Sequence, residues 1–316
     1  MADGLPASFG VKNPRNEMPN IYDRVLMTGG GGMLAHALVS VLHRRGVQPV
    51  VLARAQLDIA DALAMSDVRH QNPSLILNCA AYTKVDQCEI DEEAATRTNS
   101  MAPSLLAQTA KQIGAEIVHY STDFVFNGRS TLPYRPDDTT DALSNYGASK
   151  WVGEQLVHRS GASHLIIRTS WLYGPNGPNF VQTMLNAARA GKALTVVDDQ
   201  IGSPTFTHDL AEATLDLIDH GATGIYHATN SGQTTWFEFA KAIFEEFEVP
   251  NVNLKPISSA KWKETHPASA TRPAYSALDC SETERLIGRK MPDWRDALHR
   301  YHLLENPKFE TRNPNQ

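Results

Sequence analysis

The sequence is poor in cysteine, which excludes several classes of protein. Its three cysteines, Cys79, Cys88 and Cys280, form no CxxC pair and no even framework, as a secreted disulfide scaffold or a zinc site would require. Cys79 ends the apolar run 75–79, so we interpret it as a small core residue. Reduced thiols in a cytoplasmic setting are therefore the expectation.

Long apolar stretches and dense tracts of positive charge are also missing. No apolar stretch approaches the roughly 20 residues that span a bilayer, so we expect no membrane segment. The net charge is −6, which argues against a nucleic-acid partner, because phosphate binding needs clustered positive charge. Residues 1–22 are rich in Pro, Gly and Asn and lack the apolar core of a signal peptide. We predict a disordered tail there.

What the sequence does contain, in 316 residues, is an alternation of short β-branched runs with longer helical stretches. Buried runs separated by helices predict a parallel sheet that is covered on both faces. The right-handed crossover rule then favours a doubly wound, Rossmann-like α/β fold. The predicted strands are residues 25–28, 48–52, 75–79, 116–121 and 164–169, and the predicted helices are residues 33–45, 61–70 and 94–113.

The pattern changes after Trp171, where residues 174–178 form a turn-rich loop. Two strand-like runs, 194–197 and 225–228, and the helix 209–218 are predicted to return to the main sheet. The rest, to about residue 301, mixes a helix (236–247) with Pro-punctuated extended pieces, which predicts a smaller second lobe. We assign residues 23–171, with a returning segment at about 199–230, to the Rossmann domain. The lobe is assigned residues 172–198 and 231–304. Residues 305–316 are assigned to a polar tail.

A glycine-rich loop lies between the first predicted strand and the first predicted helix. Gly29, Gly32 and Ala35 fit G-x-x-G-x-x-G/A, the spacing of short-chain dehydrogenases. Glycine allows the backbone to turn tightly and to approach a pyrophosphate, and the helix N-terminus supplies free N–H groups and the positive end of a dipole. A plain glycine-rich turn is the alternative. The position directly after the first strand favours a dinucleotide site.

The end of the second strand bears on which dinucleotide is bound. A carboxylate there would bind the ribose 2′-hydroxyl and select NAD, but this sequence has Arg54 at that place. Arg54 could pair with a 2′-phosphate, so NADPH is favoured or tolerated, and a merely solvated arginine is the alternative. Asp58 and Ile59 follow shortly and could flank the adenine ring.

A catalytic constellation follows the fourth predicted strand. Tyr146 and Lys150 lie four residues apart, on one face of a helix. A neighbouring ammonium favours the phenolate and would bring the tyrosine pKa down from near 10 toward the working range. Thr122 ends the fourth strand, where ligands of open α/β sheets bind, and its hydroxyl could hydrogen-bond a substrate carbonyl. Asn99 could hold a water or backbone group near Lys150, although a capping or surface asparagine is equally compatible.

At these residues the sequence resembles the extended short-chain dehydrogenases and, within them, the dTDP-4-dehydrorhamnose reductase family. The resemblance runs from about residue 24 to about residue 298 and is carried by several motifs. They are Asn78-Cys79-Ala80-Ala81-Tyr82-Thr83-Lys84-Val85-Asp86, the run 119–128 with Ser121-Thr122-Asp123, the run 146–150, Arg168-Thr169-Ser170-Trp171, Asp199-Gln200, Thr234-Thr235-Trp236 and Arg272-Pro273.

The resemblance implies roles for individual residues. It assigns to the cofactor Gly32, Met33 and Leu34 at the pyrophosphate, Asp58 and Ile59 at the adenosine, and Ala81, Tyr82, Thr83, Tyr120 and Lys150 around the nicotinamide ribose. It assigns to the substrate Thr122, Asp123 and Trp171, with Tyr146 delivering the proton. The implied reaction is hydride transfer from NADPH or NADH to C4 of dTDP-4-dehydro-β-L-rhamnose, which gives dTDP-L-rhamnose.

Physical chemistry adds two expectations and leaves alternatives open. Trp171 offers a broad apolar face for a sugar ring, and Arg272 could neutralise the substrate diphosphate; an ordinary buried indole and a surface arginine are the alternatives. No metal-ligand spacing occurs near the C-terminus, so we predict no metal. A reductase or epimerase of another nucleotide-linked deoxysugar, and a non-catalytic subunit like methionine adenosyltransferase beta, remain alternatives, and a homodimer is left open.

Overall fold

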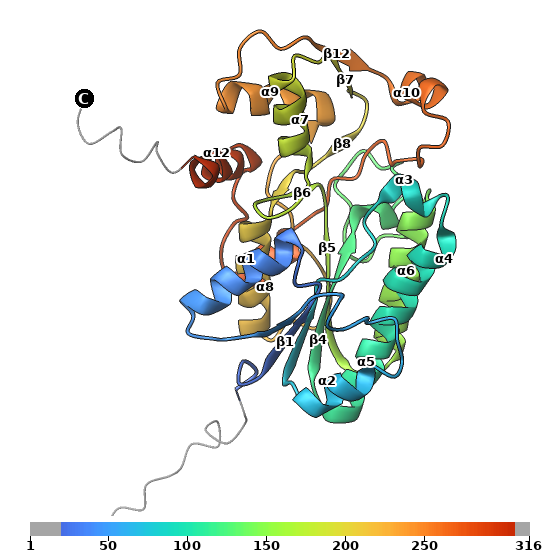
Figure 1. Cartoon of the computed structure of the whole chain (residues 1–316), viewed down its shortest axis with the longest axis vertical. Coiled ribbons are helices and arrows are strands. Elements are labelled where there is room, and N and C mark those ends of the chain that lie inside the picture. The colour runs from blue at the N-terminus through green and yellow to red at the C-terminus, as the bar shows by residue number, and fades with distance from the viewer. Residues whose placement is uncertain (1–19, 307–316) are drawn as a thin grey trace, which may run out of the picture.

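Six parallel strands form the central sheet of the computed structural model, which describes residues 20–306 (Figure 1). Their order is β10-β5-β4-β3-β1-β2, which confirms the doubly wound, Rossmann-like α/β class. The strands are β1 (Val25–Thr28), β2 (Val50–Leu52), β3 (Leu75–Asn78), β4 (Glu116–Thr122), β5 (Ser163–Thr169) and β10 (Gly224–His227). The order reverses between β1 and β3, and ligands of such sheets bind at this switch point, outside the carboxyl ends of the strands.

Alternate side chains of each strand enter two different cores. Val25 and Met27 of β1 pack into one hydrophobic cluster, whereas Leu26 packs into the other, as expected because successive strand side chains point to opposite faces. Helices α1 (Met33–Arg44) and α8 (Thr207–Asp219) cover the first face, and α2 (Met65–Gln71), α5 (Ala102–Ile113) and α6 (Asn145–Arg159) cover the second (Figure 1). The continuous apolar runs of the sequence therefore reflect burial on both faces.

Short elements connect β3 to β4 and β4 to α6. They are α3 (Val85–Cys88), α4 (Glu92–Thr96), the π-helix η2 (Arg97–Met101) that runs directly into α5, and the 3-10 turn η3 (Asp123–Val125) after β4. The single helix predicted over residues 94–113 is thus a chain of α4, η2 and α5. A π-helical turn inside a helix often marks a functional position.

A smaller lobe packs above the carboxyl edge of the sheet (Figure 1). Its core is built from α7 (Phe180–Arg189), α9 (Trp236–Glu246) and α12 (Trp294–Glu305). Its remaining elements are β6 (Leu172–Tyr173), β7 (Leu194–Val197), β8 (Ile201–Gly202), β9 (Thr205–Phe206), β11 (Thr234–Thr235), β12 (Leu254–Ile257) and α10 (Ser259–Thr265). Helix α11 (Ser281–Ile287) instead packs on α8 and β10, and its Ile287 joins the core of the sheet.

The return to the main sheet is shorter than predicted. α8 and β10 do return, and β10 pairs with β5, but β7 does not join them. Instead β7 pairs in parallel with β12 in a separate two-stranded sheet. The prediction that residues 194–197 return was wrong, because a four-residue apolar run does not reveal its pairing partner.

The chain ends differ slightly from the predicted tails. Most of residues 1–22 and 305–316 lie outside the described residues. Ile21 and Tyr22, however, pack against the core, and the Tyr22 hydroxyl donates to Asp219 at 2.7 Å, so the predicted tail was too long at this end. Glu305 still belongs to α12. Among residues 20–306 no helix has the length and apolar character needed to cross a membrane.

Candidate active site

The glycine loop turns sharply between β1 and α1. Gly29 has φ +71°, and a Cβ there would lie 2.6 Å from the Ala80 nitrogen, so only glycine allows this approach to the β3 loop. The Gly32 nitrogen donates to the Gly29 carbonyl at 2.9 Å, and Gly32 is the N-cap of α1. Met33 and Leu34 form the first helical turn, whose N–H groups lack intrahelical partners. This cradle fits a pyrophosphate.

A hollow of about 190 Å³ lies beside the end of β2, at the place predicted for the adenosine end. Arg54 and Tyr82 line it together with Arg97, which sequence reasoning missed. Arg97 pairs with Asp58 at 3.1 Å. Ile59 instead is buried in the core against the sheet, so its side chain serves packing.

The loop carrying Ala81, Tyr82 and Thr83 is held by one buried side chain from η2. Asn99 accepts from the Tyr82 nitrogen at 2.8 Å and donates to the Tyr82 carbonyl at 3.0 Å. Its amide also donates to the Ser149 hydroxyl at 3.1 Å. The predicted backbone contact of Asn99 is therefore with Tyr82, and it positions the loop from beneath.

Lys150 is buried behind the carboxyl end of β4. Its ammonium nitrogen donates to the Tyr120 carbonyl at 2.5 Å and lies 3.5 Å from His119 Nε2. Burial lowers the pKa of Lys150 to about 8, and the Glu154 carboxylate opposes this shift. Tyr120 turns its own ring into the core, where its hydroxyl donates to Thr214 at 3.2 Å.

Tyr146 lies in the first turn of α6, which begins at Asn145 because Ser144 caps the helix by accepting from the Gly147 nitrogen at 3.2 Å. Its ring packs edge-on against Phe124. Burial raises the pKa of the phenol, while a hydrogen bond with Thr122 lowers it. The expectation that Lys150 brings this pKa down was wrong for the chain by itself, because desolvation of the phenolate dominates.

Unpartnered polar atoms gather where β4 and β5 end. The Thr122 hydroxyl donates to one carboxylate oxygen of Asp123 at 3.0 Å. The other oxygen, Oδ2, is buried without a partner, as are the hydroxyls of Ser121 and Thr169. Burial raises the pKa of Asp123 to about 6. Buried polar atoms normally find partners, so these atoms fit a polar ligand at this edge.

One face of the Trp171 indole is covered by a second tryptophan. Its indole stacks on Trp236 with ring centroids 3.6 Å apart and planes within 9°. A Cβ at Gly202 would lie 2.6 to 2.8 Å from three indole atoms, so only glycine fits there. With Trp236 on one face and Gly202 close by, the contact of Trp171 with the sugar stays a prediction.

Arg272 is tied to the rim of the site. Its guanidinium pairs with Asp86, in α3 after the β3 loop, at 2.8 Å, and Asp86 also accepts from the Ala270 nitrogen at 2.9 Å. Asp86 belongs to a motif visible in the sequence, but no charge pairing across the lobes could be read from it. The pair holds Arg272 beside the loop of Tyr82.

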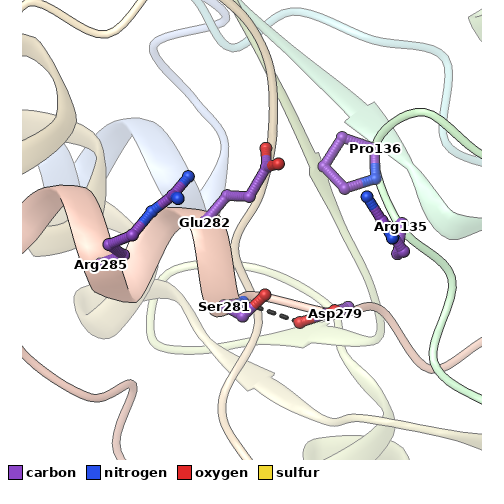
Figure 2. Close-up of a pocket in the computed structure, with 6 residues that line it drawn as sticks. All are labelled: Arg135, Pro136, Asp279, Ser281, Glu282 and Arg285. Carbon is purple, nitrogen blue, oxygen red and sulfur yellow. Dashed lines mark hydrogen bonds between the residues drawn. The ribbon is translucent and has the colours of Figure 1, made fainter.

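Two further observations delimit the site. A second hollow, of about 330 Å³, lies between the Arg135–Pro136 loop and the start of α11, and none of its six lining residues is a candidate residue (Figure 2). Its charges are mixed, since Arg135 and Arg285 face Asp279 and Glu282.

Within the described part of the chain, no group of three or more His, Cys, Asp or Glu could hold a metal ion.

The doubly wound sheet, the glycine cradle at its switch point, the buried Thr122 and Lys150 and the half-buried Tyr146 define an NAD(P)-dependent oxidoreductase of the short-chain dehydrogenase type. Residues 23–305 match the model of a family described as the RmlD substrate binding domain. The chain therefore belongs to this family.

Similar proteins agree with this placement. The chain is 42% identical to the spore coat polysaccharide biosynthesis protein SpsK of Bacillus subtilis, over 88% of this chain and 96% of that protein. It is 36% identical to a dTDP-4-dehydrorhamnose reductase of Mycolicibacterium smegmatis, over 93% and 89%. A dTDP-4-dehydrorhamnose reductase of Bacillus anthracis, solved in complex with NADP, superposes with a TM-score of 0.84 at 37% identity and covers 89% of this chain and 99% of that one.

Proposed function

We propose that this protein reduces the C4 keto group of dTDP-4-dehydro-β-L-rhamnose with NADPH or NADH and so forms dTDP-L-rhamnose. The observation that carries this proposal is the buried edge of β4 and β5, where Thr122, Asp123 and Tyr146 meet beside Lys150. The similarity to dTDP-4-dehydrorhamnose reductases over most of both chains supports this substrate in particular.

The residues that would hold the cofactor follow the carboxyl edge of the sheet. Gly29, Gly32, Met33 and Leu34 would bind its pyrophosphate, Arg54 its adenosine end, and the Tyr82 loop and Lys150 its nicotinamide ribose. When bound, the reduced nicotinamide supplies the hydride for the keto carbon.

The chain's own residues would manage the proton. Tyr146 holds a proton at its phenol because burial raises its pKa, and it would donate this proton to the C4 oxygen as negative charge develops there. The Thr122 hydroxyl, whose single proton is given to Asp123 in the chain by itself, would turn and donate to the same oxygen. Asp123 would contact the sugar through its free oxygen, the Trp171 edge would border the sugar, and Arg272 would pair with the diphosphate.

A cytoplasmic location and a homodimer belong to the same proposal. The three free cysteines of the described residues suit a reducing compartment. Exposed Trp151 and Val152 on α6 give an apolar surface for a second copy, which light scattering of the purified protein would test.

The first experiment follows the absorbance of NADPH, and separately of NADH, with freshly made dTDP-4-dehydro-L-rhamnose. We expect a substrate-dependent loss of absorbance with dTDP-L-rhamnose as the product. Proven cofactor binding without turnover would contradict the proposal and would favour another deoxysugar or a non-catalytic subunit.

A further inference from the structure

A row of buried polar side chains crosses the sheet and ends at Lys150. Thr28, Asn78 and His119 are register partners on β1, β3 and β4. Thr28 donates to Asn78 Oδ1 at 2.7 Å, Asn78 Nδ2 lies 3.0 Å from His119 Nδ1, and His119 Nε2 lies 3.5 Å from the Lys150 nitrogen. All four residues are at most 2% exposed. A continuous chain of polar contacts thus runs inside the carboxyl edge of the sheet, from Thr28 before the glycine loop to Lys150 on α6.

The row has a direction. Because Asn78 Oδ1 accepts from Thr28, its amide group faces His119 and can only donate. His119 Nδ1 therefore accepts, and the proton of the neutral imidazole sits on Nε2, facing Lys150. Burial, together with the neighbouring Lys150, lowers the pKa of His119 well below its ordinary value, which keeps the ring neutral.

An Nε2–H group facing Lys150 discriminates between the two forms of that amine. An ammonium has three donors and no acceptor, so it cannot bond a second donor, whereas the neutral amine offers a lone pair. We propose that His119, oriented by Thr28 and Asn78, is a positioning residue that favours the neutral form of Lys150 and so eases release of its proton. This inference rests on the proposed role of Lys150 in the proton supply.

The proton balance is simple. Under the proposed function, Tyr146 would give its phenolic proton to the substrate oxygen, the Lys150 ammonium would replace that proton, and solvent would reprotonate the resulting amine. A lysine that holds its proton less tightly transfers it more readily to Tyr146. After one turnover Tyr146 has lost its proton and must regain it before the next. The row would therefore affect how readily Lys150 returns that proton.

The other groups around Lys150 do not supply this discrimination. Glu154, one turn further along α6, favours the ammonium, but it is engaged by Arg168 of β5 at 2.8 Å. From η2, which packs on α6, Asn99 is uncharged, and Arg97 pairs with Asp58 away from this contact. From β4, the Tyr120 carbonyl accepts from the Lys150 nitrogen at 2.5 Å, and both the ammonium and the neutral amine can donate to it. His119 Nε2, at 3.5 Å, is the group of β4 that can distinguish the two forms.

The direct test reads the His119 tautomer in the protein without cofactor. Long-range ¹H–¹⁵N correlation on histidine-labelled protein, assigned with His119→Asn, should show the proton on Nε2. Thr28→Val keeps the shape of the side chain but frees the Asn78 amide to turn, so we expect a mixture of both tautomers. Thr283→Val, which removes a buried hydroxyl donating to the His227 carbonyl at 2.6 Å, should leave the His119 signal unchanged. A wild-type signal from Nδ1–H or from imidazolium would overturn the inference.

The second test is the pH profile of kcat/KM. In the wild type, activity should fall as pH rises through about 8, where Lys150 loses its proton. Thr28→Val should move this fall upward by roughly 0.5 to 1 pH unit, because the ammonium is no longer disfavoured. An unchanged midpoint would overturn the inference. Absence of turnover in the wild type would count against the proposed function, and the tautomer measurement would still decide the orientation of the row.

Discussion

Trp171 stacks flat on Trp236, with 3.6 Å between ring centroids. Trp171 follows β5 of the sheet domain and Trp236 opens α9 of the lobe, so this contact joins the two parts at the mouth of the site. Trp171 also has φ +48°, a left-handed conformation that is rare for a bulky residue and marks a constrained position.

Loss of this stack should loosen substrate binding. Trp236→Leu removes the cover from one indole face, and we expect KM for the sugar nucleotide to rise about tenfold and stability to fall by about 1–3 kcal/mol. Steady-state kinetics and urea unfolding measure both. The control is Trp262→Leu on α10, whose ring stacks on His266, and it should leave KM unchanged. Equal KM values for the two variants would contradict the prediction.

Tyr146→Phe removes the phenolic proton and little else. Turnover should fall at least about a hundredfold, as expected for loss of a general acid, while the binding of NADPH stays intact. Stopped-flow or steady-state absorbance measures turnover, and fluorescence titration measures binding. Tyr226→Phe on β10 is the matched control. Near-normal turnover of Tyr146→Phe would refute the proposed proton donor.

Arg54 should decide between the two nicotinamide cofactors. Arg54→Ala removes a guanidinium able to pair with the 2′-phosphate, so the Kd for NADPH should rise about tenfold with little change for NADH. Fluorescence titration of both cofactors checks this, with the exposed Arg189→Ala on α7 as control. An equal loss for NADH and NADPH would show that Arg54 does not read the phosphate.

The ionised carboxylate of Asp123 should lower the stability of the protein at neutral pH. Its pKa is raised to about 6 from an ordinary 3.8, so the stability it contributes is full below about pH 4 and is lost as pH rises through about 6. Asp123→Asn should therefore stabilise the protein at pH 7.5 by up to about 3 kcal/mol, and the gain should vanish near pH 4. Urea unfolding at both pH values measures it, with exposed Asp137→Asn as control. A gain independent of pH would point to a cause other than ionisation.

The buried pair of Glu154 and Arg168 should be costly to break. Two guanidinium nitrogens contact the two carboxylate oxygens at 2.8 and 2.9 Å, and both side chains are nearly inaccessible. Arg168→Met strands a buried carboxylate and should cost about 3–5 kcal/mol. The double variant Arg168→Met, Glu154→Leu should recover part of this loss in urea unfolding. A double variant less stable than the single one would show that the charge is not the cause.

The local pattern of the sequence was sufficient to predict the sheet. β1 and the start of α1 lie where the apolar run and the glycine loop place them, because both signals are local. The helix predicted from residue 61 begins only at Met65, since Asp58 and Asp61 bond the nitrogens two residues on and hold turns there. Short-range capping of this kind competes with helix formation.

The site could be predicted only in part. Spacing and strand ends predicted the grouping of Thr122, Tyr146 and Lys150, because chain order fixes which loops meet at a sheet edge. The roles of Trp236 and Asp86 depend on contacts between segments far apart in the chain, and the sequence gives no distance between them. The pKa of Tyr146 likewise depends on its burial, which spacing along a helix does not reveal.

The lobe is assembled from two stretches of chain, one before and one after α8 and β10, which belong to the sheet. The parallel pairing of β7 with β12 closes only when residues about sixty positions apart meet. We therefore expect the lobe to form late in folding, because the entropic cost of closing the long loop comes before the strand pairing can stabilise it. No contiguous fragment contains the lobe without also containing α8 and β10, so dissection of this protein into two independently expressed domains requires circular permutation or a designed linker.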